Sequence, residues 1–247
     1  MRPLIAIPTY NEAENLPRIV PAVLDTESEP DVIIVDDGSP DGTGDIADQL
    51  AEADSRVHVI HRPSKAGLGT AYKAAFKWAL GNDYDVAVEM DADFSHNPSD
   101  IDRLLERSDG SNLVIGSRYV PGGKVVNWAW GRRMLSRYGN RYAAFCLGLP
   151  VADATAGYRA YSRKVLEALD LDAITSNGYA FQIEMAYTVW KLGFPVVEVP
   201  ISFEDRRVGQ SKMSRKIVAE GLLWCTRQGL RDLASGLRSR ERESTAN

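Results

Sequence analysis

The first half of the chain alternates short apolar runs with helical segments, and this alternation limits the fold more than any other feature. The apolar runs end in turn residues and are expected as strands; they are Leu4–Ile7, Val32–Val35, Val57–His61, Val86–Met90 and Leu113–Gly116. The segments between them have helical spacing; they are Glu12–Leu24, Thr43–Ala53, Gly69–Leu80 and Ser99–Glu106. Such alternation is typical of βαβ units. The sequence therefore predicts an α/β, Rossmann-like fold with a mainly parallel central sheet flanked by helices.

The second half is less regular. Its pattern predicts a loop over Gly116–Gly123, a helix over Lys124–Leu149 and a strand over Pro195–Ser202. An amphipathic helix is expected over Ser214–Leu237, because leucines recur there at three- and four-residue spacing. The charged tail after it, residues 238–247, is expected to be flexible.

Charge and hydropathy exclude some classes of protein. The net charge of −5 argues against a general nucleic-acid binder. We expect no signal peptide, since the chain runs from Met1 directly into a strand-like segment. No stretch approaches 18 consecutive apolar residues, so no spanning helix is expected and any membrane contact is predicted to be peripheral.

Asp91-Ala92-Asp93 directly follows an apolar, buried-looking run and is the sharpest chemical signal. Ligands of parallel sheets bind at the carboxyl ends of the strands, which is where this segment is expected. Two carboxylates one residue apart can both face one divalent cation, and hard oxygen ligands suit Mg²⁺ or Mn²⁺. Such a cation neutralises the leaving charge of a nucleotide diphosphate. A solvated acidic turn or a helix N-cap is the alternative interpretation of this pair.

Three further segments are expected at the same sheet edge. Pro8–Glu12 ends the first strand, and its side chains are predicted to line the crevice. Asp36 and Asp37 end the second strand, where a carboxylate can accept hydrogen bonds from a base or ribose, while Ser39–Thr43 supplies turn residues. Arg62–Gly69 is a basic, glycine-bearing loop before a helix, and its backbone N–H groups can approach a ribose or phosphate.

One segment carries a strong local charge. Residues 110–152 contain no acidic residue but six basic ones, which are Arg118, Lys124, Arg132, Arg133, Arg137 and Arg141. This electropositive stretch suits a lipid phosphate or anionic headgroups. Aromatic residues favour the membrane–water interface, and those interleaved with the charges are Trp128, Trp130, Tyr138 and Tyr142. The alternative is that the aromatics belong to the core and the arginines to a solvated face.

The order of these motifs resembles that of the family 2 glycosyltransferases, which have the GT-A fold. Within that family the chain is similar to the dolichol-phosphate (polyprenol-phosphate) mannose synthases. The resemblance covers roughly residues 3–213; its motifs are Pro8–Glu12, Asp36–Thr43, Gly67–Tyr72, Asp91–Asp93, Gly116–Tyr119, Asp153–Arg159 and Asp205–Lys212. It implies a GT-A catalytic domain over residues 1–213, including the 124–149 amphipathic region, followed by the 214–237 helix and the 238–247 tail.

The resemblance also implies roles for individual residues. Catalytic roles fall to Asp91, Asp93, Arg118, Arg206 and Lys212. The nucleotide sugar is expected to contact Pro8, Tyr10, Glu12, Val35, Asp36, Asp37, Lys65, Gly67 and Ala92. The acceptor phosphate matches Arg118, Arg132 and Ser136, and the metal matches Asp91, Asp93 and Ser95. Ser95 stands where some members of the family have a glutamine metal ligand.

The implied reaction is inverting transfer of mannose from GDP-mannose to a polyprenyl (dolichyl) phosphate with Mg²⁺ or Mn²⁺. The residues themselves leave open a UDP-glucose or UDP-N-acetylhexosamine donor, and a sugar-nucleotide-binding protein without activity. The chain is expected in the cytoplasm, peripheral on the cytoplasmic face of a membrane. A separate integral membrane protein is an open partner.

Overall fold

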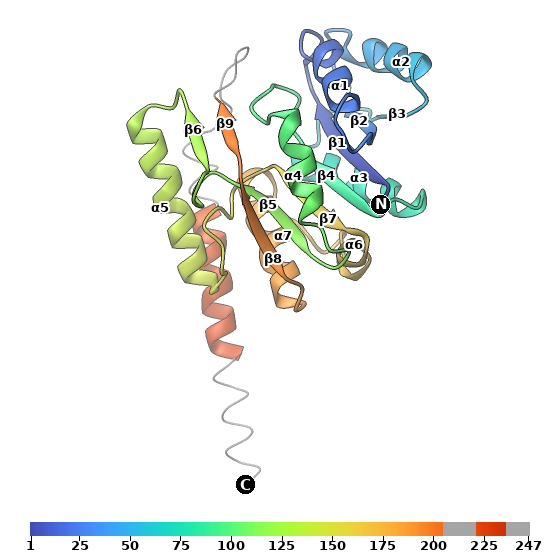
Figure 1. Cartoon of the computed structure of the whole chain (residues 1–247). Helices are drawn as coiled ribbons and strands as arrows, with labels where there is room; N and C mark the ends of the chain where they lie inside the picture. The colour runs from blue at the N-terminus through green and yellow to red at the C-terminus, as the bar shows by residue number, and fades with distance from the viewer. Residues whose placement is uncertain (205–220, 236–247) are drawn as a thin grey trace.

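The first half of the protein is an alternating α/β unit (Figure 1). The computed structural model describes residues 1–204 and 221–235. The elements of this half are β1 (Pro3–Thr9), α1 (Leu16–Leu24), β2 (Asp31–Asp36), α2 (Thr43–Ala53), β3 (Val57–His61), α3 (Leu68–Gly81), β4 (Val86–Glu89), the short 3₁₀ helix η1 (Pro98–Asp100), α4 (Ile101–Glu106) and β5 (Leu113–Ser117). The predicted strands and helices are confirmed, although the first helix begins at Leu16 instead of Glu12.

The second half departs more from expectation. Its elements are β6 (Lys124–Val126), α5 (Trp130–Leu147), β7 (Arg159–Ser162), α6 (Arg163–Ala168), α7 (Gly178–Lys191), β8 (Val196–Pro200) and β9 (Ser202–Glu204). The prediction of a helix starting at Lys124 was wrong, because Val125 and Val126 form β6, which pairs in parallel with β9. The prediction of a single strand over Pro195–Ser202 was also wrong, because two strands, β8 and β9, occupy this region. At Ile201 the chain bonds to Ser117 and Lys124 and leaves the main sheet.

The main sheet has seven strands in the order β3-β2-β1-β4-β7-β5-β8. All its neighbouring strands are parallel except those paired with β7, which runs antiparallel between β4 and β5. The mainly parallel sheet is thus confirmed. β7, α6 and α7 had no counterpart in the sequence analysis. α7 buries apolar residues on most of its surface, so it lacks the one-sided stripe that marks an amphipathic helix.

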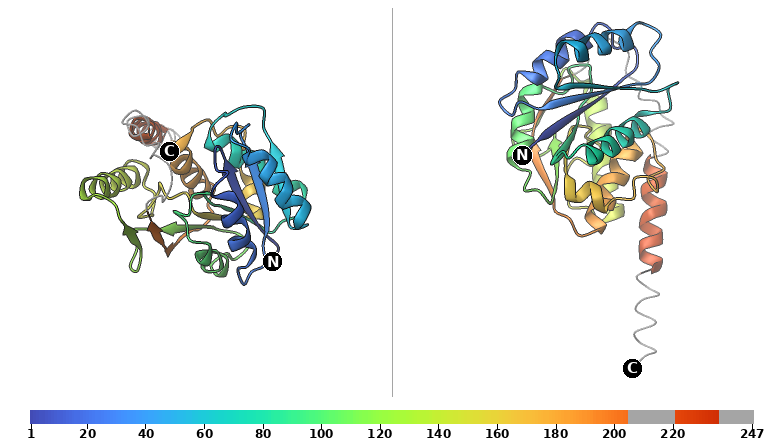
Figure 2. Two further views of the ribbon diagram at one scale, coloured as in Figure 1. Left: turned by 90° about the horizontal axis from the view of Figure 1, so that it is seen from above. Right: turned by 90° about the vertical axis from the view of Figure 1, so that its right-hand side faces the viewer.

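Helices cover both faces of the sheet, as the views in Figure 2 show. Side chains of a strand alternate between faces. Leu4 and Ala6 accordingly pack with Phe76 of α3, whereas Ile5 and Ile7 pack on the other face with helices α1 and α4. Burial on both faces explains why the parallel strands read as continuous apolar runs.

The strand order reverses at β1, which lies between β2 and β4. The chain builds β2 and β3 on one side of β1 and then places β4 on the other side. The loops after β1 and β4 therefore diverge, which opens a crevice at the carboxyl ends of the strands. This topology, and no single residue, sets the position of the site.

Residues 221–235 form a helix beside α5 (Figure 1), within the expected amphipathic segment 214–237. The Tyr142 and Thr226 hydroxyls are hydrogen-bonded at 2.7 Å, and Gly229 lies against the backbone of Cys146. Cys225 and Gly229 are buried against the protein, whereas three leucines of this helix are exposed; they are Leu223, Leu230 and Leu233. The boundary at residue 213 lies outside the described residues. Among the described helices, none is long and apolar enough to cross a membrane.

Candidate active site

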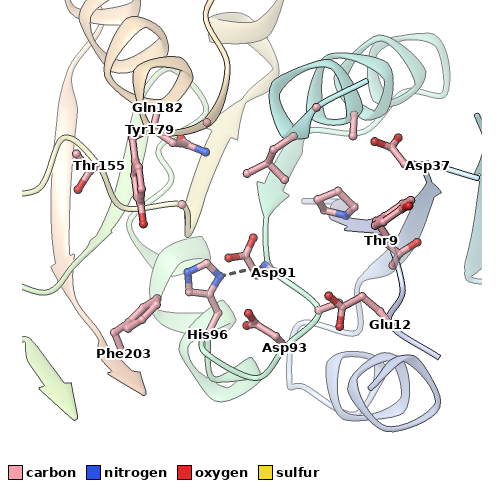
Figure 3. A pocket seen from close by; sticks show the side chains of 18 of the residues that line it. Thr9, Glu12, Asp37, Asp91, Asp93, His96, Thr155, Tyr179, Gln182 and Phe203 are labelled. Carbon is pink, nitrogen blue, oxygen red and sulfur yellow. Dashed lines mark hydrogen bonds between the residues drawn. The ribbon is translucent and has the colours of Figure 1, made fainter. Parts of the chain in front are cut away.

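A cavity of about 300 Å³ lies at the carboxyl ends of β1, β2 and β4. Figure 3 shows side chains from both halves of the chain around it. Many residues selected from the sequence line it; they are Pro8, Tyr10, Glu12, Asp37, Lys65, Gly67, Asp91, Ala92, Asp93, Arg118 and Arg132. Segments far apart in the sequence, chosen separately for donor and acceptor, therefore meet in one cavity.

Some expected site residues do not line this cavity. Val35 belongs to the core, and Ser95 and Ser136 lie outside the lining. The Asp36 carboxylate accepts hydrogen bonds from the Thr9 hydroxyl at 3.0 Å and from the Ser39 hydroxyl at 2.6 Å. Asp36 therefore holds the turn after β2 together. Arg206 and Lys212 lie outside the described residues.

A tight turn after β4 presents Asp91 and Asp93. The Asp91 N–H donates to Nδ1 of His96 at 3.1 Å, and the Ser95 N–H donates to Oδ1 of Asp93 at 3.0 Å. Phe94, between Asp93 and Ser95, has φ = 60°, a left-handed conformation that is unfavourable for a bulky residue. The turn is therefore held by specific bonds, and both carboxylates lie at the cavity wall.

The two carboxylates fit a divalent cation that also binds the substrate. In the part of the chain that the structure describes, no group of three or more His, Cys, Asp or Glu residues is placed to hold a metal. Mg²⁺ is commonly bound by one or two carboxylates, with phosphate oxygens and water completing the octahedron. The Ser95 hydroxyl is buried and has no partner among the described residues. An oxygen donor two residues after Asp93 thus remains without a bond.

The loop after β3 is attached to the end of β2. Nη1 of Arg62 forms an ion pair with Oδ1 of Asp37 at 2.8 Å, and the Ala66 N–H donates to Oδ2 at 3.3 Å. In the same wall the Lys65 ammonium lies 4.0 Å from the centre of the Tyr10 ring. These contacts bring the basic loop to the strand ends, as the sequence predicted for Arg62–Gly69.

Arg118 enters the cavity from the end of β5 and is held by a buried carboxylate. Its Nε and Nη2 each donate to Asp153 at 2.7 Å, and Nη2 also donates to the Thr155 hydroxyl at 2.9 Å. Burial alone would raise the pKa of Asp153, but the Arg118 guanidinium outweighs it and holds this pKa below its usual value. Arg118 therefore carries a fixed, oriented charge.

Arg132 approaches the same cavity from α5. Its guanidinium carbon lies 4.0 Å above the Trp128 ring, and Trp128 meets Phe203 edge-on with the ring centres 5.5 Å apart. Trp128 is only 8% exposed, so its expected place at a membrane interface was wrong: it forms part of the cavity wall. Trp130, two residues later, is 76% exposed.

A buried polar cluster lies behind Asp91. Gln182 of α7 donates to Glu89 at 2.8 Å, and burial, opposed only in part by Arg159 and Gln182, raises the pKa of Glu89 to about 8. The fully buried Arg159 donates to the backbone carbonyls of Ala154, Ala156 and Gln182. Arg159 thereby fastens the loop that carries Asp153 and Thr155.

Sequence reasoning missed several lining residues. Tyr179 and Gln182 belong to α7, and only the turn-forming Asn177-Gly178 pair at its N-terminus signals its start. Thr155 lies within the Asp153–Arg159 motif, which was recognised without a role for each member. His96 also lines the cavity, and its bond to the Asp91 backbone has no sequence signature.

Solved structures share the overall fold of this chain, which is the GT-A fold. Glucosyl-3-phosphoglycerate synthase from Mycobacterium tuberculosis, solved with phosphoglyceric acid, is similar with a TM-score of 0.66 and 21% identity, covering 91% of this chain and 80% of that chain. A mannosyltransferase from Pyrobaculum calidifontis, solved with GDP-Man and Mn²⁺, has a TM-score of 0.59 and 16% identity, covering 96% and 75%. At these identities the likeness establishes the fold alone.

The chain belongs to the family described as Glycosyl transferase family 2, which it matches over residues 4–170. An undecaprenyl-phosphate mannosyltransferase from Micrococcus luteus is 54% identical over 240 residues, covering 97% of this chain and 99% of the relative. A polyprenol monophosphomannose synthase from Mycolicibacterium smegmatis is also 54% identical, over 232 residues, covering 93% and 88%. The protein is therefore a glycosyltransferase.

Proposed function

We propose that this enzyme transfers mannose from GDP-mannose to a polyprenyl (dolichyl-type) phosphate, giving polyprenyl-phosphate β-mannose and GDP. One observation carries the proposal: a carboxylate pair, Asp91 and Asp93, shares a single cavity with two guanidinium groups, Arg118 and Arg132. The first pair suits a metal-bound diphosphate and the second an anionic acceptor. The two relatives named for mannosyl transfer to polyprenyl phosphates support the choice of sugar and acceptor.

On the donor side, Tyr10, Glu12 and Asp37 hold the nucleoside, with Lys65 and Gly67 of the basic loop close by. Asp91 and Asp93 hold Mg²⁺ or Mn²⁺, with Ser95 proposed as a third protein ligand. The bound cation supplies neutralisation of the diphosphate charge. Arg206 and Lys212, proposed from the family resemblance alone, add positive charge as the GDP departs.

On the acceptor side, the nucleophile is an oxygen of the lipid phosphate. This oxygen is already anionic at neutral pH, so the reaction needs no strong general base, in contrast to attack by a sugar hydroxyl. Arg118, Arg132 and Ser136 position the phosphate, and the fixed geometry of the Arg118–Asp153 pair supports that role. Attack from the face opposite the leaving GDP inverts the anomeric carbon.

The lipid acceptor requires access to a bilayer, and we propose peripheral binding at the cytoplasmic face. Helix α5 supports it with exposed apolar side chains, which are Trp130 (76%), Tyr138 (61%) and Phe145 (86%). Exposed arginines on the same helix suit anionic headgroups; they are Arg133, Arg137 and Arg141. A separate integral membrane protein is a proposed additional anchor.

The test is a donor panel with one polyprenyl phosphate acceptor, with lipid-linked product as the readout. GDP-mannose with Mg²⁺ or Mn²⁺ should give product, whereas UDP-glucose and UDP-N-acetylglucosamine should give little. Product from a UDP-sugar instead would identify a transferase with the same fold and another donor. Absence of product and of nucleoside diphosphate release with every donor would leave only a sugar-nucleotide-binding protein.

A further inference from the structure

A second pocket of about 780 Å³ opens beside the active-site cavity, between the loop after β5 and helix α5. Arg118 lines both, so the two spaces are neighbours. The other lining residues are Tyr119, Val120, Pro121, Gly123, Lys124, Val125, Val126, Asn127, Arg133 and Arg137. None of the residues assigned above to the donor lies in this lining, and of the three assigned to the acceptor phosphate only Arg118 does.

The pocket is strongly basic. Its lining contains no acidic residue, and Lys124, Arg133 and Arg137 form no ion pair within the described parts of the chain. Arg118 differs from them, because Asp153 balances its charge. Three positive charges at one opening repel one another, so a bound anion stabilises this arrangement.

Two of these side chains are already oriented at the pocket. Nη2 of Arg133 donates to the carbonyl oxygen of Val125 at 3.3 Å, and the Arg137 guanidinium lies 5.9 Å from the centre of the Tyr119 ring. Both contacts join α5 to the loop that forms the opposite wall. Less side-chain freedom is then lost when the guanidinium groups bind a phosphate.

Apolar side chains line the same opening beside the charges; they are Val120, Pro121, Val125 and Val126. Trp130, the first residue of α5, is 76% exposed. A ligand matched to this surface has an anionic phosphate beside apolar carbon, which describes a phospholipid better than a free phosphate ion.

We propose that this pocket binds the phosphate of an anionic membrane phospholipid that is not the acceptor. The inference rests on the membrane association proposed above. Its consequence is that a lipid of the bilayer, held between Lys124, Arg133 and Arg137, docks the protein with the mouth of the active site beside the membrane. The acceptor phosphate can then reach Arg118 from the adjoining cavity.

The experiment compares two variants of the full chain that each lose one positive charge on the same helix. Arg137→Gln alters the pocket, whereas Arg141→Gln removes an exposed arginine one turn later that is not in the lining. Binding is measured by calorimetry with monomeric dihexanoyl phosphatidylglycerol and with inorganic phosphate. Co-sedimentation uses phosphatidylcholine vesicles containing about 20 mol% phosphatidylglycerol.

Arg137→Gln should weaken binding of the short-chain lipid about tenfold, since a hydrogen bond to a charged group is lost, and Arg141→Gln should change it less than about twofold. Inorganic phosphate should bind more weakly than the lipid. Equal losses for the two variants would overturn the pocket and leave only general attraction to an anionic surface. Equal affinity for phosphate and lipid would identify a free-phosphate site and overturn the lipid assignment.

Failure of this inference is separable from failure of the proposed function. GDP-mannose binding and mannosyl transfer to polyprenyl phosphate in detergent test the reaction without a bilayer. If transfer occurs but the short-chain lipid does not bind, the pocket assignment alone is wrong.

Discussion

Arg118 and Asp153 form a two-point ion pair with both nitrogen–oxygen distances at 2.7 Å, and their side chains are 5% and 0% exposed. Glu198 of β8 in turn accepts a hydrogen bond from the Asp153 backbone N–H at 2.9 Å. The end of β5 and the loop before β7 thus meet at this ion pair, and strand β8 holds the backbone of Asp153. A residue selected from the sequence for acceptor binding is also a structural member of the fold.

We expect Asp153→Asn to destabilise the protein by about 3–5 kcal/mol, because it leaves the Arg118 charge buried without a counter-ion. The measurement is the free energy of unfolding by denaturant. Asp172→Asn is the control, since Asp172 pairs with Lys77 at the surface and is 78% exposed; its loss should change stability far less than that of Asp153. Equal effects of the two substitutions would contradict the structural role of Asp153.

Arg118→Lys tests the acceptor role while keeping a positive charge near Asp153. Lysine cannot reproduce the two-pronged geometry of arginine, so the KM for polyprenyl phosphate should rise about tenfold. The affinity for GDP-mannose, measured by calorimetry, should stay within about twofold of the wild type. A fall in donor affinity with an unchanged acceptor KM would assign Arg118 to the donor.

Asp91→Ala and Asp93→Ala should each reduce the transfer rate by at least about 10²-fold, because an unscreened diphosphate is a poor leaving group. Glu52→Ala on the exposed surface of α2 is the matched control and should leave the rate unchanged. Titration with Mn²⁺ gives a second readout, since each site variant should bind the ion more weakly. Near-normal turnover by both variants would remove the metal from the mechanism.

Glu89 predicts a pH dependence of stability. Its folded pKa of about 8 lies above the ordinary value of 4.5, so between these values the folded state holds a proton that the unfolded chain has lost. The stability of metal-free protein should therefore fall as pH rises through this window, by on the order of 1 kcal/mol per pH unit from this group. Glu89→Gln, neutral in both states, should remove that slope. Parallel stability curves for both proteins would contradict the raised pKa.

Gly229→Ala tests how residues 221–235 are seated. An added Cβ at Gly229 would overlap the carbonyl oxygen of Cys146 on α5, whereas one at Gly139 in the middle of α5 meets no atom within 4 Å. Gly229→Ala should therefore destabilise the protein and speed proteolysis of this helix. Gly139→Ala should stabilise α5 by up to about 1 kcal/mol, the difference in helix propensity. Equal protection in both variants would contradict the close contact.

The sequence by itself determined the alternating α/β unit and the donor side of the site. A buried parallel strand requires a continuous apolar run, and ligands bind where such strands end. The run Val86–Met90 followed by Asp91 and Asp93 therefore locates the carboxylates from the sequence alone. Both properties are local along the chain, which is why they can be read from it. The same reasoning predicted that Tyr10, Asp37 and Lys65 lie at the same edge of the sheet.

Only the tertiary structure decided how the other half of the chain completes the site. β7 inserts between β4 and β5, α7 brings Gln182 to Glu89, and Asp153 meets Arg118 across 35 positions of sequence. It also separated Trp128, which is buried, from Trp130, which is exposed. These outcomes depend on which surfaces meet after the chain has folded. Contacts between residues far apart in the sequence produce no periodic pattern in that sequence, so they cannot be predicted from it.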